Sequence, residues 1–341
     1  MFRSIQIGSN SNMHRVYQIV LLLLLYQTVC LTVSKAIECK SSSSPSNVAH
    51  TISVSKNGNG HFTHIEDALK SIPTTNDQWV KILISPGEYR EQIRIFSKSC
   101  IILEGQDRTT TTITHDVHNT TSGSITFDTY EVDNFIVKGI TFRNSYNRPY
   151  NKRTPHVPAV ALRASGDKHV YHSCGFEGYQ DTLWDDKGRH NFKSCYIEGA
   201  VDFIWGDAQS VYEHCTINVT GGGHITAQGR DSSQKTSGYV FKNCKILGEG
   251  RATLGRAYRA YARVIFVDSY FSNAVNPLGW FIWNQAGHEK DITFAEINCN
   301  GPGANRSKRV PWVKSLSRYE VEQFTTNAYI GQGGWIRKFL I

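Results

Sequence analysis

The hydrophobic positions of this chain follow three different patterns in turn. A long apolar run, Val16 to Val33, comes first. Between Thr63 and Ile72 the apolar residues recur with a helical period, and Pro73 ends this short helix. Beyond it, short apolar runs separated by Gly and Asn occur at 80–84, 101–103, 136–137 and 141–142. These runs do not alternate cleanly with polar residues, which predicts strands buried on both faces, as in parallel sheets.

The first apolar run has the features of a secretory signal. Arg3 and Arg15 precede it, and Ser34-Lys35-Ala36 supplies the small-x-small pattern that signal peptidase accepts. The alternative is a single membrane anchor, because the run is near the lower length limit for spanning. Gln18, Gln27 and several threonines in this region disfavour that alternative. The expected organisation is therefore a cleaved signal over 1–36, a polar linker over 37–47 and a folded domain over 48–341.

An internal repeat organises the middle of the chain. Four segments place an aromatic residue three positions before a cysteine: Tyr171/Cys174, Phe192/Cys195, Tyr212/Cys215 and Phe241/Cys244. A period near 20 residues, with short strands and no helix between them, is typical of a β-solenoid. The predicted fold is all-β, a single-stranded right-handed parallel β-helix whose N-terminal end is capped by the short helix at 63–72.

The first two copies of the repeat also match after the cysteine and place Asp181 and Asp202 at equivalent positions. Equivalent positions on consecutive coils lie one inter-strand spacing apart, about 4.8 Å. Two carboxylates so close disfavour each other's charge, so one tends to keep its proton while the other ionises. Such a pair provides an acid and a nucleophile or base at one pH. The alternative is a ladder of turn aspartates that cap backbone amides.

Composition and charge narrow the class of protein. Hydrophobic residues make up 40% of the chain and aromatics 11%, which fits a packed globular protein. The net charge is +8, and loss of Arg3, Arg15 and Lys35 with the signal leaves +5. This charge would hold a secreted protein near an anionic matrix, although ordinary solubility accounts for it equally well. Three N-glycosylation motifs begin at Asn119, Asn218 and Asn305.

The cysteines and histidines do not suggest a metal site. Seven cysteines remain once the signal is removed, and this odd number requires a free thiol or an intermolecular bridge. Their connectivity does not follow from the sequence. The chain contains neither Cys-x-x-Cys nor His-Glu-x-x-His. We therefore expect no metal and no cofactor.

Several ordered motifs resemble the pectin methylesterase (pectinesterase) family, especially plant members without a pro-region. The resemblance runs from about Val54 to Ile336. The motifs are Gly87-Glu88-Tyr89-Arg90-Glu91, Tyr179-Gln180-Asp181-Thr182-Leu183, Gly199-Ala200-Val201-Asp202-Phe203-Ile204-Trp205-Gly206, Ala227-Gln228-Gly229-Arg230, Leu254-Gly255-Arg256-Ala257-Tyr258 and Gly279-Trp280. Each motif is weak alone, but together and in this order they are specific.

The resemblance implies a role for each matching residue. Asp202 would attack the methyl ester of a galacturonate unit, and Asp181 would act as general acid and then as general base. Gln180 would donate to the oxyanion, and Arg256 would keep Asp202 ionised and oriented. The aromatic residues of the motifs would contact sugar rings, or simply pack in the core: Tyr179, Phe203, Trp205, Tyr258 and Trp280. Tyr258 and Trp280 are the favoured subsite residues.

The resemblance also implies the setting. The substrate would be methyl-esterified homogalacturonan (pectin), and the protein would be secreted to the cell wall, where a proteinaceous inhibitor is a possible partner. We expect a monomer that binds neither nucleic acid nor, after signal cleavage, a membrane. The Gly87 to Glu91 motif is expected to be architectural.

Two departures from the family pattern bear on activity. Pro158 stands where the family has a glutamine that supports the oxyanion, and proline cannot donate a hydrogen bond. Ala257-Tyr258 replaces the usual Pro-Trp. A non-catalytic or weakly active pectin-binding wall protein is therefore an alternative function. Asp185-Asp186 raises a third, a polygalacturonase or pectate lyase, although the accompanying signatures of those enzymes are missing.

Overall fold

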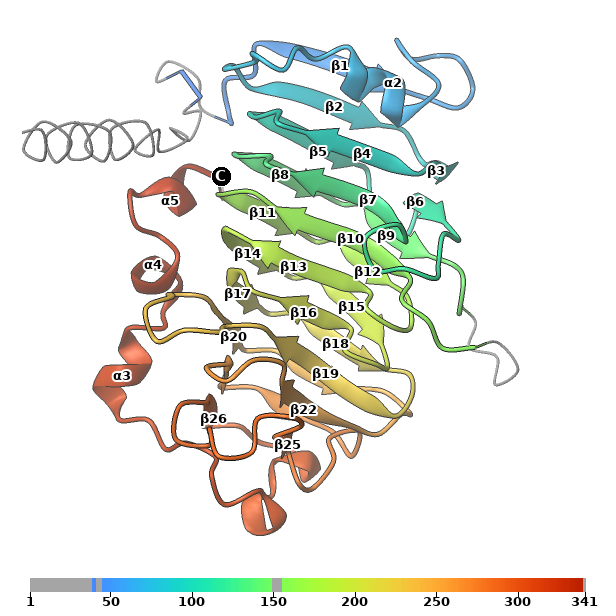
Figure 1. Ribbon diagram of the computed structural model, residues 1–341. Coiled ribbons are helices and arrows are strands. Elements are labelled where there is room, and N and C mark those ends of the chain that lie inside the picture. Colours follow the sequence, from blue (N-terminus) through green and yellow to red (C-terminus); the bar gives the residue numbers. More distant parts are fainter. Residues whose placement is uncertain (1–38, 41–44, 149–154, 340–341) are drawn as a thin grey trace, which may run out of the picture. The chain divides into compact units, whose positions relative to one another are not determined.

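The computed structural model describes residues 39–40, 45–148 and 155–339. The predicted signal at 1–36 and most of the predicted linker lie outside the described residues. The contacts group Glu38–Ile341 into one unit. Within this unit the strands stack as successive coils of a right-handed parallel β-helix, which confirms the predicted fold class (Figure 1).

Three parallel sheets run along this stack, and each takes one strand from each successive coil. Sheet 1 comprises β1 (His50–Val54), β2 (Val80–Ile84), β5 (Ile101–Gly105), β8 (Phe135–Lys138), β11 (His169–His172), β14 (Arg189–Lys193), β17 (Gln209–Glu213), β20 (Gly238–Lys242), β23 (Arg263–Val267) and β26 (Thr293–Ile297). Sheet 2 comprises β4 (Ile93–Phe96), β7 (Ile125–Tyr130), β10 (Val160–Ser165), β13 (Leu183–Lys187), β16 (Ile204–Gly206), β19 (Gly223–Gln228), β22 (Ala252–Ala257) and β25 (Trp280–Phe281). Sheet 3 comprises β3 (Gly87–Arg90), β6 (Thr111–His115), β9 (Thr141–Asn144), β12 (Gly175–Glu177), β15 (Tyr196–Gly199), β18 (Thr216–Val219), β21 (Lys245–Leu247) and β24 (Tyr270–Phe271).

The aromatic–cysteine repeat forms ladders inside the coils. The rings of Tyr171, Phe192, Tyr212 and Phe241 stack in sequence, with centroids 4.8, 4.6 and 4.4 Å apart. The cysteine that follows each ring is buried and free. Because every coil contributes the same residue types at the same places, like side chains lie on like side chains. The repeat in the sequence is therefore the periodic core of the solenoid.

A short helix covers the N-terminal end of the stack, as predicted, although it is shorter than the predicted 63–72. Helix α2 (Ile65–Lys70) buries Ile65, Ala68 and Leu69 against the first coils. The carboxylate of Glu91 accepts the backbone N–H groups of Ile65 and Glu66, at 3.0 and 2.9 Å. These bonds satisfy donors that a helix start leaves open. The motif that contains Glu91 thus has the expected architectural role.

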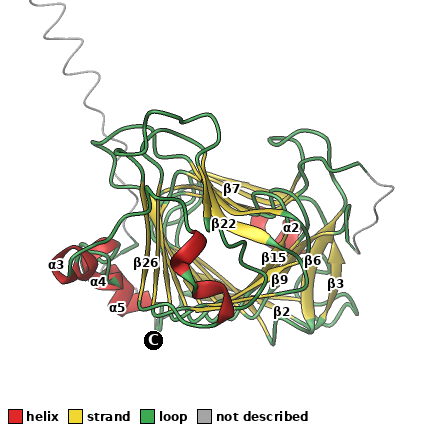
Figure 2. Cartoon of the chain, turned by 90° about the horizontal axis from the view of Figure 1, so that it is seen from below, coloured by secondary structure: helices red, strands yellow, loops and turns green. Residues whose placement is uncertain are grey.

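The C-terminal segment adds helices that the sequence pattern did not predict. Helices α3 (Arg318–Glu322), α4 (Thr326–Tyr329) and α5 (Trp335–Phe339) lie beside sheet 1 (Figures 1 and 2), after two 3₁₀ turns, η1 (Pro302–Ala304) and η2 (Arg306–Lys308). Tyr329, Trp335 and Phe339 pack with outward residues of the sheet, including Val170 and Val211. These helix residues cover the outer face of sheet 1. Because both faces of the sheet are then buried, its strands do not alternate between apolar and polar residues. No helix in the described residues is long and apolar enough to span a membrane.

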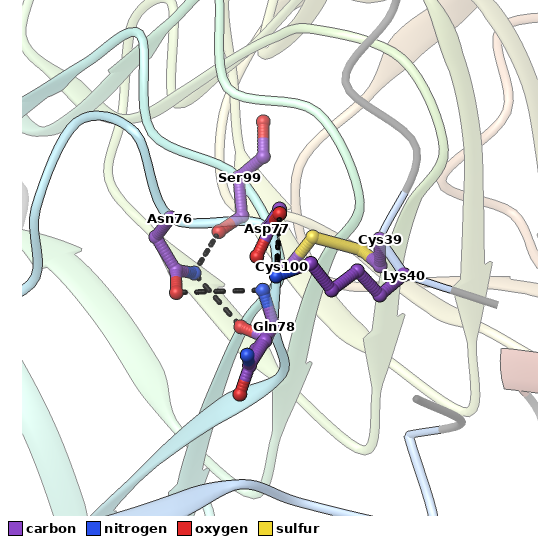
Figure 3. Close-up of a disulfide and its surroundings, with 7 residues drawn as sticks. All are labelled: Cys39, Lys40, Asn76, Asp77, Gln78, Ser99 and Cys100. Carbon is purple, nitrogen blue, oxygen red and sulfur yellow. Dashed lines mark hydrogen bonds and ion pairs between the residues drawn. A yellow bond between two sulfur atoms is a disulfide. The ribbon is translucent and has the colours of Figure 1, made fainter. Parts of the chain in front are cut away.

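One disulfide ties the start of the described chain to the second coil. Cys39 is bonded to Cys100, 61 residues away (Figure 3), and the backbone N–H of Lys40 donates to the Asp77 carbonyl at 2.8 Å. The predicted linker is therefore anchored to the β-helix at its start. The other cysteines of the described chain are free: Cys174, Cys195, Cys215, Cys244 and Cys299.

Candidate active site

Asp181 and Asp202 occupy the same corner of consecutive coils, just before β13 and β16. Gln180 pairs with Val201 and Leu183 with Ile204, so one offset of 21 residues relates the two coils. The backbone is left-handed at both aspartates, with φ of 61° at Asp181 and 49° at Asp202. Aspartate tolerates this conformation better than most residues. The predicted stacking of the two carboxyl-bearing positions is thus present.

The corner also explains the glycine that precedes each aspartate in the repeat. A Cβ on Gly199 would lie 2.3 Å from the Cβ of Phe203, and one on Gly178 would lie 2.8 Å from the Thr182 hydroxyl. The residues that follow the two aspartates, Thr182 and Phe203, are fully buried. Each of their side chains therefore points inward and packs against the preceding glycine. The aspartate itself is left on the outer side of the coil.

Arg256, on β22, distinguishes Asp202 from Asp181. Its Nε and Nη2 donate to the two carboxylate oxygens of Asp202 at 2.8 and 2.7 Å. Such a bidentate pair fixes the orientation of a carboxylate as well as its charge. The Trp283 ring lies 3.9 Å from the guanidinium carbon and the Tyr258 ring 5.0 Å from it. Contact with these π faces holds the guanidinium in place.

Asp181 has the electrostatics of a carboxylic acid that stays protonated near neutrality. Burial and then the neighbouring Asp202 charge raise its pKa to about 7, although Arg256 opposes the shift. Removing a carboxylate from water and placing it beside a like charge both disfavour ionisation. A group with such a pKa can give and take a proton at neutral pH. The pair therefore combines an oriented carboxylate with a proton donor.

These groups face one pocket. It is lined by Thr121, Gln180, Asp181, Asp202, Trp205, Ala227, Arg256 and Tyr258. The structure thus brings together all four predicted catalytic residues, with two of the five predicted aromatic ones. The Trp205 indole stacks on Trp184, at 4.4 Å, and donates to the Asp181 carbonyl at 3.4 Å. In the described ranges, no three His, Cys, Asp or Glu residues are grouped as metal ligands.

The prediction that Phe203 and Trp280 contact sugar rings is wrong, because both residues lie in the core. Phe203 follows the left-handed corner at Asp202 and points inward with no exposed surface. Trp280 is 1% exposed, stacks on Phe294 and donates its indole N–H to Glu296 at 3.0 Å. Tyr179 is also nearly buried, at 4% exposed, and packs beside His156.

Asp185 takes no part in the pocket either. Its carboxylate is fully buried and bonded to His190 Nδ1 at 2.5 Å and to the Tyr212 hydroxyl at 2.7 Å. This internal network satisfies the hydrogen-bonding groups of a buried side chain. Asp186 is partly exposed and lines a separate pocket with Lys187 and Asp207. The Asp185-Asp186 pair therefore does not present two exposed carboxylates together, as the polygalacturonase alternative needs.

Two residues of the site were not predicted. Trp283, which lies over Arg256, follows Trp280 by three positions, and neither the repeat nor a quoted motif contains it. Thr121 lies in the loop between β6 and β7, two coils before Asp181. No pattern in the sequence placed either residue near the aspartates, because both reach the site through the stacking of coils distant in sequence.

Comparisons with known proteins agree with this geometry. The Pectinesterase family matches residues 51–334. Probable pectinesterase 55 of Arabidopsis thaliana is 43% identical over 294 residues, which cover 83% of this chain and 89% of that protein. Putative pectinesterase 10 of the same plant is 42% identical over 307 residues, which cover 87% of this chain and 90% of that protein.

Solved structures show the same likeness in three dimensions. Pectin methylesterase from carrot superposes with a TM-score of 0.79 at 29% identity, covering 85% of this chain and 96% of that one. The deglycosylated pectin methylesterase from Aspergillus niger superposes with a TM-score of 0.73 at 29% identity, covering 84% of this chain and 95% of that one. This chain belongs to the pectinesterase family of carboxylic ester hydrolases.

Proposed function

We propose that this protein hydrolyses the methyl esters of galacturonate units in pectin, releasing methanol and leaving de-esterified pectin. Membership of the family supports the substrate class. One observation supports the chemistry above all: the Arg256–Asp202 pair lies beside Asp181, a carboxyl group with a pKa of about 7. This unequal pair can supply the nucleophile and the proton carrier that ester hydrolysis through a covalent intermediate requires.

In the first half of the reaction Asp202 is the nucleophile. One of its carboxylate oxygens attacks the ester carbonyl carbon, and the carbonyl oxygen becomes an oxyanion that the Gln180 amide stabilises. The bond to the methoxy oxygen then breaks, and Asp181 gives its proton to the departing methanol. The product of this half is a mixed anhydride between Asp202 and the galacturonate carbonyl.

In the second half Asp181 acts as a base. As a carboxylate it removes a proton from water, and the resulting hydroxide attacks the acyl carbon. The bond to Asp202 breaks, which releases galacturonic acid and restores ionised Asp202 and protonated Asp181. The product then gives its proton to solvent and becomes the carboxylate. Arg256 keeps the Asp202 oxygens oriented throughout, because both of its bonds are to that carboxylate.

The setting of this activity is part of the proposal. An apolar run near the N-terminus with a small-x-small site supports secretion, and a pectin esterase would then act in the plant cell wall. Trp205 and Tyr258 line the pocket and offer ring faces to the polysaccharide.

Methanol release from methylated pectin by purified protein tests the proposal. We expect the wild type to release methanol and Asp202→Asn to lose about 10³-fold or more of the rate, since Asn keeps the shape but is not a nucleophile. Asp268→Asn is the matched control. Asp268 is exposed and has φ of 51°, close to that of Asp202, but it does not line the pocket. Equal rates for Asp202→Asn and wild type would favour the non-catalytic pectin-binding alternative.

A further inference from the structure

Thr121 brings a further neutral hydrogen-bond donor to the pocket. It lies in the loop between β6 and β7 and lines the pocket with Gln180, Asp181 and Asp202. The residue is partly exposed, and its hydroxyl makes no hydrogen bond within the described ranges. A donor in this position can serve an atom of the substrate.

The loop that carries Thr121 is held firmly. The Thr120 N–H donates to the Ser124 hydroxyl at 2.9 Å, and the Ser124 N–H returns to the Thr120 carbonyl at 2.9 Å. Fully buried Asn144 donates its amide to the carbonyls of Val117 and Ser124, at 2.7 and 3.4 Å, and so ties both ends of the loop together. A donor on such a loop is positioned before substrate arrives, as electrostatic stabilisation requires.

The order of the coils explains why a loop residue reaches the pocket here. The backbone N–H of Val160 donates to the Ser124 carbonyl oxygen at 2.7 Å, and the backbone N–H of Ala159 donates to the Gln180 carbonyl oxygen at 3.3 Å. The coil that contains Pro158 thus lies between the Thr121 loop and the coil of Gln180. Proline contributes no donor from that intermediate coil. Thr121 and Gln180 therefore approach Asp202 from the same side, the N-terminal side of the stack.

Other donors in the pocket are bonded within the protein, buried, or on the C-terminal side of Asp202. Arg256 Nη1 has no hydrogen-bond partner in the described part of the chain, but it is buried and comes from β22, on that C-terminal side. Arg256 gives two of its N–H groups to Asp202, and the Trp205 indole donates to the Asp181 carbonyl. Tyr258 follows β22, on the C-terminal side of Asp202, and its ring stacks on Trp283. We infer that the Thr121 hydroxyl is a second oxyanion donor that acts together with Gln180. This inference rests on the proposed function, since it needs attack on an ester carbonyl.

The kinetics of methanol release from methylated pectin test this role in the full-length protein. Thr121→Val removes the hydroxyl at nearly constant volume, and we expect kcat to fall about 10- to 100-fold with KM changed less than about threefold. Thr121→Ser keeps a hydroxyl and should retain most of kcat. Thr121 also completes the Asn119-Thr120-Thr121 glycosylation motif. Asn119 has φ of 100°, which aspartate tolerates better than most residues, so Asn119→Asp, which removes the motif, is the matched control and should behave as wild type. Thermal unfolding of each variant checks the fold.

The possible outcomes separate this inference from the proposed function. If Asp202→Asn is inactive while Thr121→Val keeps its kcat, the proposed function stands and the role of Thr121 is overturned. A joint loss of kcat in Thr121→Val and Asn119→Asp would assign the effect to a glycan and also overturn the role of Thr121. If the wild type releases no methanol, both proposals fall together. A fall in kcat that occurs in Thr121→Val, but not in Thr121→Ser or in the glycosylation control, supports the inference.

Discussion

Asp181 and Asp202 have nearly the same backbone conformation on consecutive coils, but only Asp202 is bonded to Arg256 in the described structure. The repeat therefore places two carboxyl groups side by side, and a residue from a later coil makes them unequal. Burial and the Asp202 charge then raise the pKa of Asp181 to about 7. The division between nucleophile and proton carrier follows from this asymmetry.

Arg256→Lys should retain the positive charge but lose the bidentate geometry. A lysine ammonium cannot donate two parallel bonds to Asp202, and it loses the stacking on Trp283. Because a small displacement of a nucleophile costs up to about 10²-fold, we expect kcat to fall about 10- to 100-fold. Steady-state methanol release measures this, with Arg318→Lys, an exposed residue of α3, as the control. Unchanged kcat in Arg256→Lys would mean that charge alone suffices.

Asp181→Asn should abolish most activity and also stabilise the protein at high pH. Aspartate loses its proton near pH 3.9 in the unfolded chain, but near pH 7 in the folded one. Folding therefore takes up a proton between these values, and the wild type loses stability as pH rises through that window. An asparagine removes this loss.

Urea unfolding at pH 5 and pH 8 measures the difference. The free energy of unfolding of Asp181→Asn, relative to that of the wild type, should be about 2–3 kcal/mol larger at pH 8 than at pH 5. Asp268→Asn is the control and should show no such growth with pH. A gain that is equal at both pH values would contradict the raised pKa of Asp181.

Pro158→Gln should compensate for loss of the Thr121 hydroxyl. A glutamine amide on the coil between Thr121 and Gln180 is a donor where proline has none. We expect the Thr121→Val/Pro158→Gln double variant to recover about tenfold of the kcat that Thr121→Val loses. Added to the wild type, Pro158→Gln should change kcat far less. Equal effects in both backgrounds would show that the two positions act independently.

The Cys39–Cys100 disulfide should affect stability without affecting catalysis. It closes a segment of 61 residues at the N-terminal end of the stack, and no pocket residue touches it. A Cys39→Ser/Cys100→Ser variant should lose about 2–4 kcal/mol of unfolding free energy. Its kcat should match that of Cys299→Ser, which removes a free thiol. A loss of kcat comparable to that of Arg256→Lys would contradict this separation.

The sequence predicts the site as far as the repeat extends. Asp181 and Asp202 are related by the repeat itself, so their stacking follows from the residues alone. The aromatic predictions fail for a local reason. The left-handed corner at Asp202 turns Phe203 inward, and strand alternation turns Trp280 inward and Phe281 outward. A sequence motif does not indicate whether such a side chain points into the core or out of it.

Other parts of the structure depend on contacts between distant segments. Thr121 reaches the pocket and Trp283 reaches Arg256 from coils on either side of the aspartates, and neither has a repeated counterpart. Cys39 precedes the first coil, so no period indicates its partner. Helices α3 to α5 are short, and packing on sheet 1 rather than a helical period in the sequence accounts for them.

Titration of the side-chain carboxyl groups tests the central claim most directly. In protein labelled with carbon-13 at aspartate carboxyls, NMR should show one group titrating near pH 7 that is absent in Asp181→Asn. In Asp202→Asn its midpoint should fall but stay above pH 4, because burial is the larger cause of the shift. An Asp181 midpoint near pH 4 in the wild type would contradict the account, since the pair would then lack a proton donor at neutral pH.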